Sequence, residues 1–279
     1  MLARYKVILS YDGTQFSGFQ RLSKTNEKLP HTVQGAFENA LKSLDWKGET
    51  VWAAGRTDAG VHAIGQVVAF DLDWNHNDHQ LLDALNTYLP LDVVGLAIEE
   101  VSPFFHPRYD AKWRKYQYHF FYHPKRQPLL ERYAWRVNRY LDLEGMEKAA
   151  LCFLGIHDFA PFGSPPKKGG STVRTVYESS WHQERNVLVW TIVANAFLLH
   201  MVRRMIGLLM AVGQKQVFAD SVDYYLGISL KEEIIPIKVD WYYFYRSRLS
   251  IPKVSWLAPA HGLFLTDVGY QPYQLEKAV

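Results

Sequence analysis

Alternation of apolar and polar positions, or a short continuous apolar run, predicts β-strands in both halves of the chain. The clearest case is residues 114–122, where Tyr116, Tyr118 and Phe120 share one face while Gln117 and His119 share the other. Further strands are predicted at residues 4–11, 51–54, 64–70, 93–101, 171–182, 187–194 and 263–268. Strands therefore recur along almost the whole chain.

Apolar positions spaced three and four apart predict helices between these strands. They cover residues 32–41, 77–89, 143–154 and 197–212, and Thr32 is placed to cap the first helix. Strands and helices follow one another in a similar order in both halves, which favours an α+β fold of two-layer halves. We expect an N-terminal half over residues 1–110 and a C-terminal half over residues 111–279.

Composition restricts the class of protein. The chain has 279 residues, of which 48% are hydrophobic and 21% charged, as in a globular protein. The longest late apolar run, residues 205–212, is far too short to span a bilayer, so no membrane association is expected. Cys152 is the single cysteine, which excludes an internal disulfide framework and a cysteine-rich zinc site. We therefore expect a reducing, cytoplasmic setting.

Positive charge is clustered rather than abundant. The formal net charge is only +3, so a nucleic-acid surface requires local grouping of basic residues. Such groups are Arg108, Lys112, Arg114 and Lys115, then Lys167 with Lys168, and Arg203 with Arg204. A solvated face is the commoner explanation of each such group, but their interleaving with aromatic residues favours RNA binding.

The segment at residues 55–62, Gly-Arg-Thr-Asp-Ala-Gly-Val-His, is the strongest candidate for chemistry. It is predicted as a tight loop between two buried strands, with Asp58 as its only carboxylate. Gly55 and Gly60 permit positive φ and close backbone approach, and Arg56 offers a fork of hydrogen-bond donors. The alternative is an ordinary turn in which Arg56 and Asp58 form a surface ion pair.

The predicted helix at residues 197–212 carries a second polar candidate. His200, Arg203 and Gly207 share one face, whereas the core stripe is formed by Met201 and its helical neighbours. His200 and Arg203 can be a polar rim of a packed helix. Gly207 on the same face nevertheless allows something to approach closely.

Taken together, the motifs resemble those of the tRNA pseudouridine synthase A family. The resemblance rests first on residues 55–63, on residues 114–118 (Arg-Lys-Tyr-Gln-Tyr) and on residues 195–203 (Asn-Ala-Phe-Leu-Leu-His-Met-Val-Arg). Residues 11–14, 18–20, 32–35, 84–86, 89–90 and 258–263 also match the family's motifs in their order. The resemblance therefore covers nearly the whole chain.

The resemblance implies an RNA-modifying isomerase. Its fold would be two ferredoxin-like or RRM-like halves whose antiparallel sheets join around a central, positively charged cleft. A homodimer would convert uridine to pseudouridine in the anticodon arm of tRNA, with no metal and no cofactor. Asp58 would be the nucleophile, Arg203 its ion-pair partner and Tyr116 the active-site aromatic residue, while Arg56 would hold a flipped-out nucleotide.

The remaining basic residues are expected to contact RNA and to supply salt-sensitive affinity. They are His62, Arg108, Arg114, Lys115, Lys167, Lys168 and His200. A metal site built from histidines is disfavoured, because His62, His106 and His200 lack the spacing and the carboxylates of such sites. Asp12 is expected to be an Asx-turn residue instead of a chemical group.

Two other classes of protein remain as alternatives. A non-catalytic RNA-binding protein with two RRM-like halves would use the same exposed aromatic residues, but would gain nothing from Asp58. A metal-dependent hydrolase acting on RNA would be inhibited by a chelator. The aromatic segment at residues 241–246 is compatible with packing, which we favour, or with RNA stacking.

Overall fold

The computed structural model describes residues 2–21, 31–165, 167, 169–228 and 253–274. In the first half, the elements are β1 (Leu2–Tyr11), α1 (Val33–Lys42), β2 (Trp52–Ala53), β3 (His62–Asp73), α2 (Asp78–Tyr88) and β4 (Val93–Val101). The second half contains β5 (Trp113–Tyr122), β6 (Trp135–Val137), α3 (Leu143–Leu151), β7 (Gly155–Asp158), β8 (Val173–Glu184), β9 (Val187–Ala194), α4 (Met201–Gly213), α5 (Ser221–Tyr225) and β10 (Leu263–Gly269). Short 3₁₀ turns occur at Gly13–Gln15 and Ala260–Gly262.

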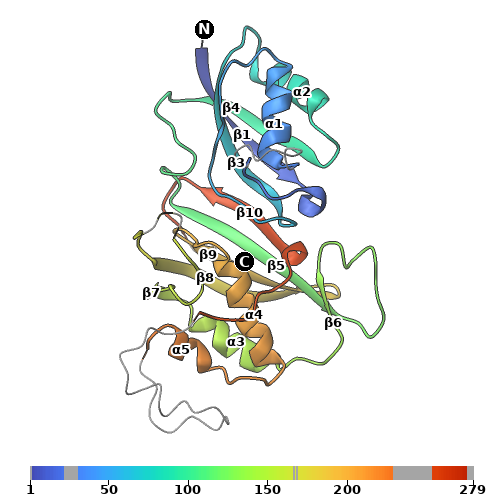
Figure 1. Ribbon diagram of the computed structural model, residues 1–279, viewed down its shortest axis with the longest axis vertical. Helices are drawn as coiled ribbons and strands as arrows, with labels where there is room; N and C mark the ends of the chain where they lie inside the picture. The colour runs from blue at the N-terminus through green and yellow to red at the C-terminus, as the bar shows by residue number, and fades with distance from the viewer. Residues whose placement is uncertain (1, 22–30, 166, 168, 229–252, 275–279) are drawn as a thin grey trace, which may run out of the picture.

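The fold is α+β, and the described strands form one sheet, in the order β4-β1-β3-β10-β5-β9-β8-β7. The strand β2 pairs with β3 beside this path, and β6 pairs with β5. Figure 1 shows β10 and β5 running across the middle of the molecule, between the first half and the rest of the second half. One sheet therefore continues from the first half into the second.

The pattern-based predictions of most elements are confirmed. The strands β4 and β9 have the predicted bounds, and β5 differs from its prediction by one residue. Thr32 caps α1, because its side chain accepts a hydrogen bond from the Gly35 N–H at 3.2 Å. In β5 Tyr116, Tyr118 and Phe120 are buried as alternation requires.

The C-terminal strand β10 connects the two halves. It runs parallel to β3, with Leu265 opposite Ala63, and antiparallel to β5, with Leu265 opposite Tyr116. The Leu265 side chain is completely buried. Because β10 comes from the second half of the sequence and pairs with β3, it joins the strands of the two halves in one sheet.

The prediction of a helix from residue 197 is wrong, because α4 begins at Met201. The apolar pattern does extend back to residue 197, but the backbone there has other partners. The Asn195 side chain accepts hydrogen bonds from the Thr175 and Ala196 N–H groups, and the Leu199 N–H bonds to the Ser164 carbonyl. His200 then turns the chain with φ 64°, in the left-handed region.

Short elements also escaped prediction. The strands β6 and β7 and the helix α5 lie in segments with no predicted regular structure, and α3 ends at Leu151, before the predicted end. None of the described helices has the length and apolar character needed to cross a membrane. The aromatic segment at residues 241–246 lies outside the described residues.

Candidate active site

The loop before β3 is held in place from three directions. Gln66, fully buried on β3, accepts a hydrogen bond from the Gly55 N–H at 3.3 Å and donates to the Gly55 carbonyl at 2.9 Å. The Phe19 N–H donates to the Thr57 carbonyl at 3.0 Å, and the Thr57 and Tyr11 hydroxyls lie 2.8 Å apart. The residues that precede Asp58 are therefore fixed before any ligand binds.

Glycines make this close packing feasible. Gly18 has φ 101°, and a Cβ built on it would lie 3.0 Å from the Thr57 carbonyl oxygen. Gly60 has φ 76°, which lets the chain turn sharply behind Asp58. The predicted glycine bend is confirmed at Gly60, whereas Gly55 does not have a positive φ, and His62 belongs to the following strand.

Asp58 and Arg203 form an ion pair across the two halves. The Arg203 Nη1 donates to the Asp58 Oδ2 at 2.9 Å, and the side chains are 16% and 22% exposed respectively. The Arg203 Nε donates to the Ala258 carbonyl at 2.8 Å, while the Ala258 N–H donates back to the Arg203 carbonyl at 3.0 Å. The guanidinium is thus oriented by the backbone as well as by the carboxylate.

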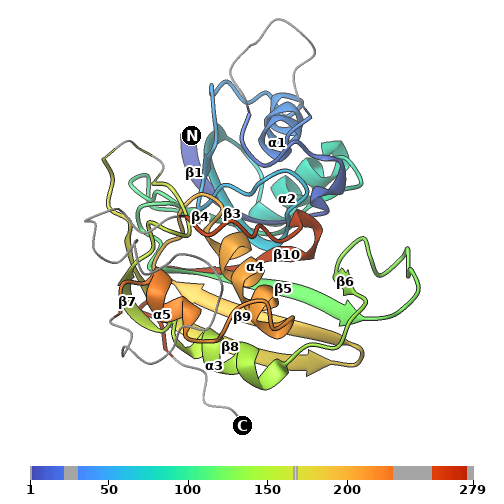
Figure 2. The same cartoon turned by 60° about the horizontal axis from the view of Figure 1, so that its bottom comes forward.

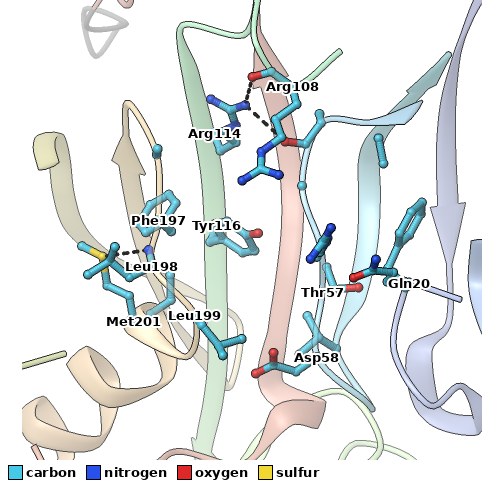
Figure 3. Close-up of a pocket in the computed structure, with 18 of the residues that line it drawn as sticks. Gln20, Thr57, Asp58, Arg108, Arg114, Tyr116, Phe197, Leu198, Leu199 and Met201 are labelled. Atoms are coloured by element: carbon cyan, nitrogen blue, oxygen red, sulfur yellow. Dashed lines mark hydrogen bonds between the residues drawn. The ribbon is translucent and has the colours of Figure 1, made fainter. Parts of the chain in front are cut away.

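Tyr116 stands beside this pair on β5. Figure 3 shows its ring projecting between Phe197 on one side and the loop that carries Thr57 and Asp58 on the other. Its ring packs edge-on against Phe197, with centroids 5.1 Å apart. Burial raises the pKa of Tyr116 far above its usual range, so the hydroxyl is neutral and able to donate a proton in a hydrogen bond.

These residues line a cavity of about 520 Å³. Among the described residues that line it, Asp58 supplies the only carboxylate, whereas the arginines are Arg56, Arg108, Arg114, Arg174 and Arg203. Such an excess of fixed positive charge favours a polyanionic ligand. The dimensions also fall within the usual range for pockets that bind small groups.

Arg114 is a brace of the cavity wall. Its two terminal nitrogens donate to four backbone carbonyls, those of Ala54, Arg108, Ala111 and Asn195, at distances between 2.6 and 3.2 Å. The bond to the Arg108 carbonyl is visible in Figure 3. Because these donors are already engaged, Arg114 is not free to bind a phosphate as expected. Its side chain instead holds together three connections, β2–β3, β4–β5 and β9–α4.

His62 lies away from the cavity, contrary to the expectation that it contacts RNA. Its side chain is 2% exposed, its Nδ1 accepts a hydrogen bond from the Gly13 N–H at 3.1 Å, and its ring stacks on Phe264. Burial lowers its pKa, which keeps the imidazole neutral. The Asx turn predicted at Asp12 is confirmed by a bond from the Thr14 N–H to Oδ1.

The other predicted contacts are distributed unevenly. Arg56, Arg108 and His200 line the cavity, and the His200 Nε2 is 3.5 Å from the Asp58 Oδ2. Lys115 and Lys167 are not among its lining residues, and Lys168 lies outside the described residues. Within the described chain no three His, Cys, Asp or Glu side chains group as a metal site would require.

Several lining residues were missed by the sequence analysis. Arg174 comes from β8, and His106 and Tyr109 come from the connection between β4 and β5. The neighbourhood of Arg108 was a usable signal for Tyr109, because basic and aromatic residues are adjacent there. Nothing local to β8 distinguishes Arg174. The close approach predicted at Gly207 is confirmed, because a Cβ there would lie 2.6 Å from the Trp256 carbonyl oxygen.

Comparison with known proteins identifies the class. Residues 7–110 and 149–241 match the family profile described as tRNA pseudouridine synthase. A relative from Bacillus anthracis named tRNA pseudouridine synthase A 2 is 34% identical over 266 residues, covering 95% of this chain and 99% of the relative. The tRNA pseudouridine synthase A of Roseiflexus castenholzii is 38% identical, covering 94% of this chain and 88% of its own length.

These matches define an isomerase that modifies RNA. The chain belongs to the tRNA pseudouridine synthase family. Among solved structures, an archaeal box H/ACA sRNP Nop10-Cbf5 complex is similar with a TM-score of 0.33 at 13% identity, covering 71% of this chain and 45% of that chain. At that score the similarity carries no argument about this protein.

Proposed function

We propose that this protein converts uridine to pseudouridine in the anticodon stem-loop of tRNA, with Asp58 as the nucleophile. The observation that carries the proposal is the ion pair between Asp58 and Arg203, at 2.9 Å, in a cavity whose other Asp, Glu, Lys or Arg lining residues, among those described, are all arginines. The family membership supports tRNA as the substrate, and the choice of the anticodon arm follows the resemblance of the motifs.

The reaction breaks the bond between N1 of uracil and C1′ of ribose and forms a bond between C5 and C1′. N1 gains a proton and C5 loses one, so no oxidant or water is consumed. As the nucleophile Asp58 attacks the sugar or the base, and in the alternative route it acts as a base at the sugar. In each route Arg203 fixes the carboxylate oxygen that it contacts and leaves the other oxygen available.

Tyr116 and Arg56 are proposed to hold the target outside the RNA stack. Extrusion of a nucleotide costs a few kcal/mol of unstacking, and an aromatic partner returns about 1–3 kcal/mol. The Tyr116 ring is available inside the cavity, and Arg56 is an exposed cation on the same loop as Asp58. The Tyr116 hydroxyl, kept neutral by burial, can donate to a uracil oxygen.

The same proposal covers the larger assembly. The first half has the element order β-α-β-β-α-β, and the second half has the same order with β6, β7 and α5 added. The sheet orders β4-β1-β3-β2 and β10-β5-β9-β8 support two ferredoxin-like halves over residues 1–110 and 111–279. Figure 2 shows the first half, with α1 and α2, above β10 and β5, and the strands β8 and β9 of the second half below them. The arginine-rich cavity that the two halves share supports a positively charged cleft between them. A cytoplasmic homodimer is proposed from the resemblance.

The decisive experiment measures release of tritium from tRNA labelled at C5 of uridine. Wild-type protein is compared with Asp58→Asn, with and without a chelator, and tRNA binding is measured for both. We expect release by the wild type alone, equal binding by both proteins, and no effect of the chelator. Tight binding without release from any tRNA would instead support the RNA-binding protein, and cleavage of the tRNA that a chelator abolishes would support the hydrolase.

A further inference from the structure

Part of the cavity wall consists of aromatic rings that the proposed chemistry does not use. They belong to Trp52, His106 and Tyr109, which all line the same cavity as Asp58. The His106 and Tyr109 rings are 4.3 Å apart and tilted by 37°, and Trp52 follows at 6.3 Å from His106. Tyr109 is nevertheless 71% exposed, so one face of its ring is covered while much of the ring remains open.

The loop that carries these rings is ordered by its own hydrogen bonds. The His106 Nδ1 accepts from the Arg108 N–H at 3.1 Å, and the His106 N–H donates to the Asp110 Oδ2 at 2.8 Å. The Tyr270 hydroxyl donates to the Pro107 carbonyl at 3.0 Å. Burial lowers the pKa of His106, which matches its role as an acceptor. Tyr109 is therefore presented from a preorganised loop.

Trp52 is supported from behind in a similar way. The Arg4 guanidinium lies 4.3 Å from the centre of the indole ring. Its orientation is fixed by two bonds to Asp71, at 2.6 and 2.8 Å, and by a third to the Phe105 carbonyl. This cation–π contact with a fixed guanidinium holds the Trp52 ring in place.

Next to these rings lies the Arg108 guanidinium, whose hydrogen-bond donors are free among the described residues. Within the described part of the chain, the Arg108 guanidinium has neither a carboxylate nor a hydrogen-bond acceptor in contact, and its Cζ is 6.0 Å from the centre of the Tyr109 ring. Figure 3 shows this side chain reaching down into the cavity. A guanidinium beside an open aromatic face is complementary to a phosphate beside a nucleobase.

We propose that Tyr109, backed by His106 and Trp52, stacks the base of an unpaired nucleotide next to the target uridine, while Arg108 binds its phosphate. This inference rests on the proposed function, because it assumes RNA in the Asp58 cavity. On this proposal the site binds two nucleotides: the target enters the cavity for reaction, and its neighbour is held by stacking. Stacking accepts any base, so the subsite supplies register and affinity rather than sequence identity.

The test combines protein variants with altered RNA stem-loops. Tyr109→Leu, Tyr109→Phe and the control Phe104→Leu are compared for binding to a stem-loop that contains the target uridine. Phe104 is on the same loop and 90% exposed but does not line the cavity. We expect Tyr109→Leu to weaken binding roughly tenfold, in the range of a lost base stack, and the other two variants to bind as wild type.

Abasic substitution of each nucleotide that flanks the target identifies the partner of Tyr109. At one flanking position, the abasic change should weaken binding to the wild type and have little further effect on Tyr109→Leu, as expected for two changes that remove one contact. Arg108→Gln should reduce the slope of log affinity against log salt by about 0.7, the loss of one phosphate contact on single-stranded RNA.

Additive effects at every position, or equal losses for Tyr109→Leu and Phe104→Leu, would overturn the subsite. Melting temperatures of all variants separate these outcomes from misfolding. Tritium release by the wild type is measured in parallel on the same stem-loop. If release occurs and the cycle is additive, only the subsite fails; if the wild type gives no release, the proposed function fails first.

Discussion

Among single residues, Arg203 illustrates how strongly the candidate site depends on geometry. Its guanidinium joins the carboxylate of Asp58 in the first half to the Ala258 carbonyl in the second. Two other arginines of the cavity have different surroundings. The terminal nitrogens of Arg114 both donate to backbone carbonyls, whereas the Arg108 guanidinium contacts no acceptor among the described residues. Identical side chains thus brace, pair or remain available, according to their neighbours.

Replacement of Arg203 should separate chemistry from binding. We expect Arg203→Gln to lower the single-turnover rate of uridine conversion by about 100-fold, the usual cost of removing one charged donor from a preorganised site, while tRNA affinity changes little. Arg204→Gln is the matched control, because its guanidinium donates to the Phe162 carbonyl and does not line the cavity. Equal rates for the two variants would argue against the ion pair.

His62 predicts a pH dependence of stability. Burial holds its pKa below the unfolded value near 6.5, so the unfolded chain binds the proton more tightly. The stability that this histidine contributes is therefore complete above pH 6.5 and is lost as the pH falls below it. His62→Asn, which keeps an acceptor for the Gly13 N–H, should flatten the decrease in unfolding free energy between pH 6.5 and 5, measured by urea denaturation. An unchanged slope would contradict this assignment.

At the scale of elements, both ends of α4 have residues in the left-handed region. His200 precedes the helix with φ 64°, and Lys215 follows it with φ 58°, where the Lys215 and Gln216 N–H groups close the last turn. Only the first of these positions approaches the site, because the His200 Nε2 lies near the Asp58 carboxylate. The start of α4 is therefore strained where the chemistry is expected.

Glycine substitutions at these two positions provide a paired test. We expect His200→Gly and Lys215→Gly each to raise the unfolding free energy by about 1 kcal/mol, because glycine adopts positive φ without steric cost. Only His200→Gly should slow uridine conversion, by about fivefold for the loss of one weak polar contact. Thermal melting and tritium release measure the two effects, and a slower Lys215→Gly enzyme would count against the local explanation.

At the scale of the whole molecule, β10 makes the two halves a single sheet. Leu265 is buried between Ala63 of β3 and Tyr116 of β5. The strand therefore sets the relation between Asp58, which precedes β3, and Tyr116, which lies on β5. A defect in β10 is expected to affect both halves at once.

Leu265→Ala should reduce the unfolding free energy by about 2–5 kcal/mol, as expected for a cavity at a buried leucine. We further expect amide hydrogens of β3 and β5 to lose protection from exchange together. Leu91→Ala, at a fully exposed leucine in the turn before β4, is the control and should change stability by less than about 0.5 kcal/mol. Loss of protection confined to β5 would show that the halves unfold separately.

Local patterns were sufficient for most elements and for the candidate carboxylate. Alternation in β5, the cap at Thr32 and the glycine-bent loop around Asp58 depend on neighbours within a few residues, so the sequence alone determined them. It also determined the family, through motifs spread along the chain. The short strands β6 and β7 lacked such a signal, because tertiary pairing supports them.

Only the tertiary structure decided which side chains meet. Arg203 lies 145 positions beyond Asp58 in the chain, yet their atoms are 2.9 Å apart. His62 belongs to the motif of Asp58, but its side chain is buried against Phe264 of β10 and does not line the cavity. Local spacing carries the information for secondary structure, whereas contacts, burial and the engagement of each arginine depend on how distant segments pack.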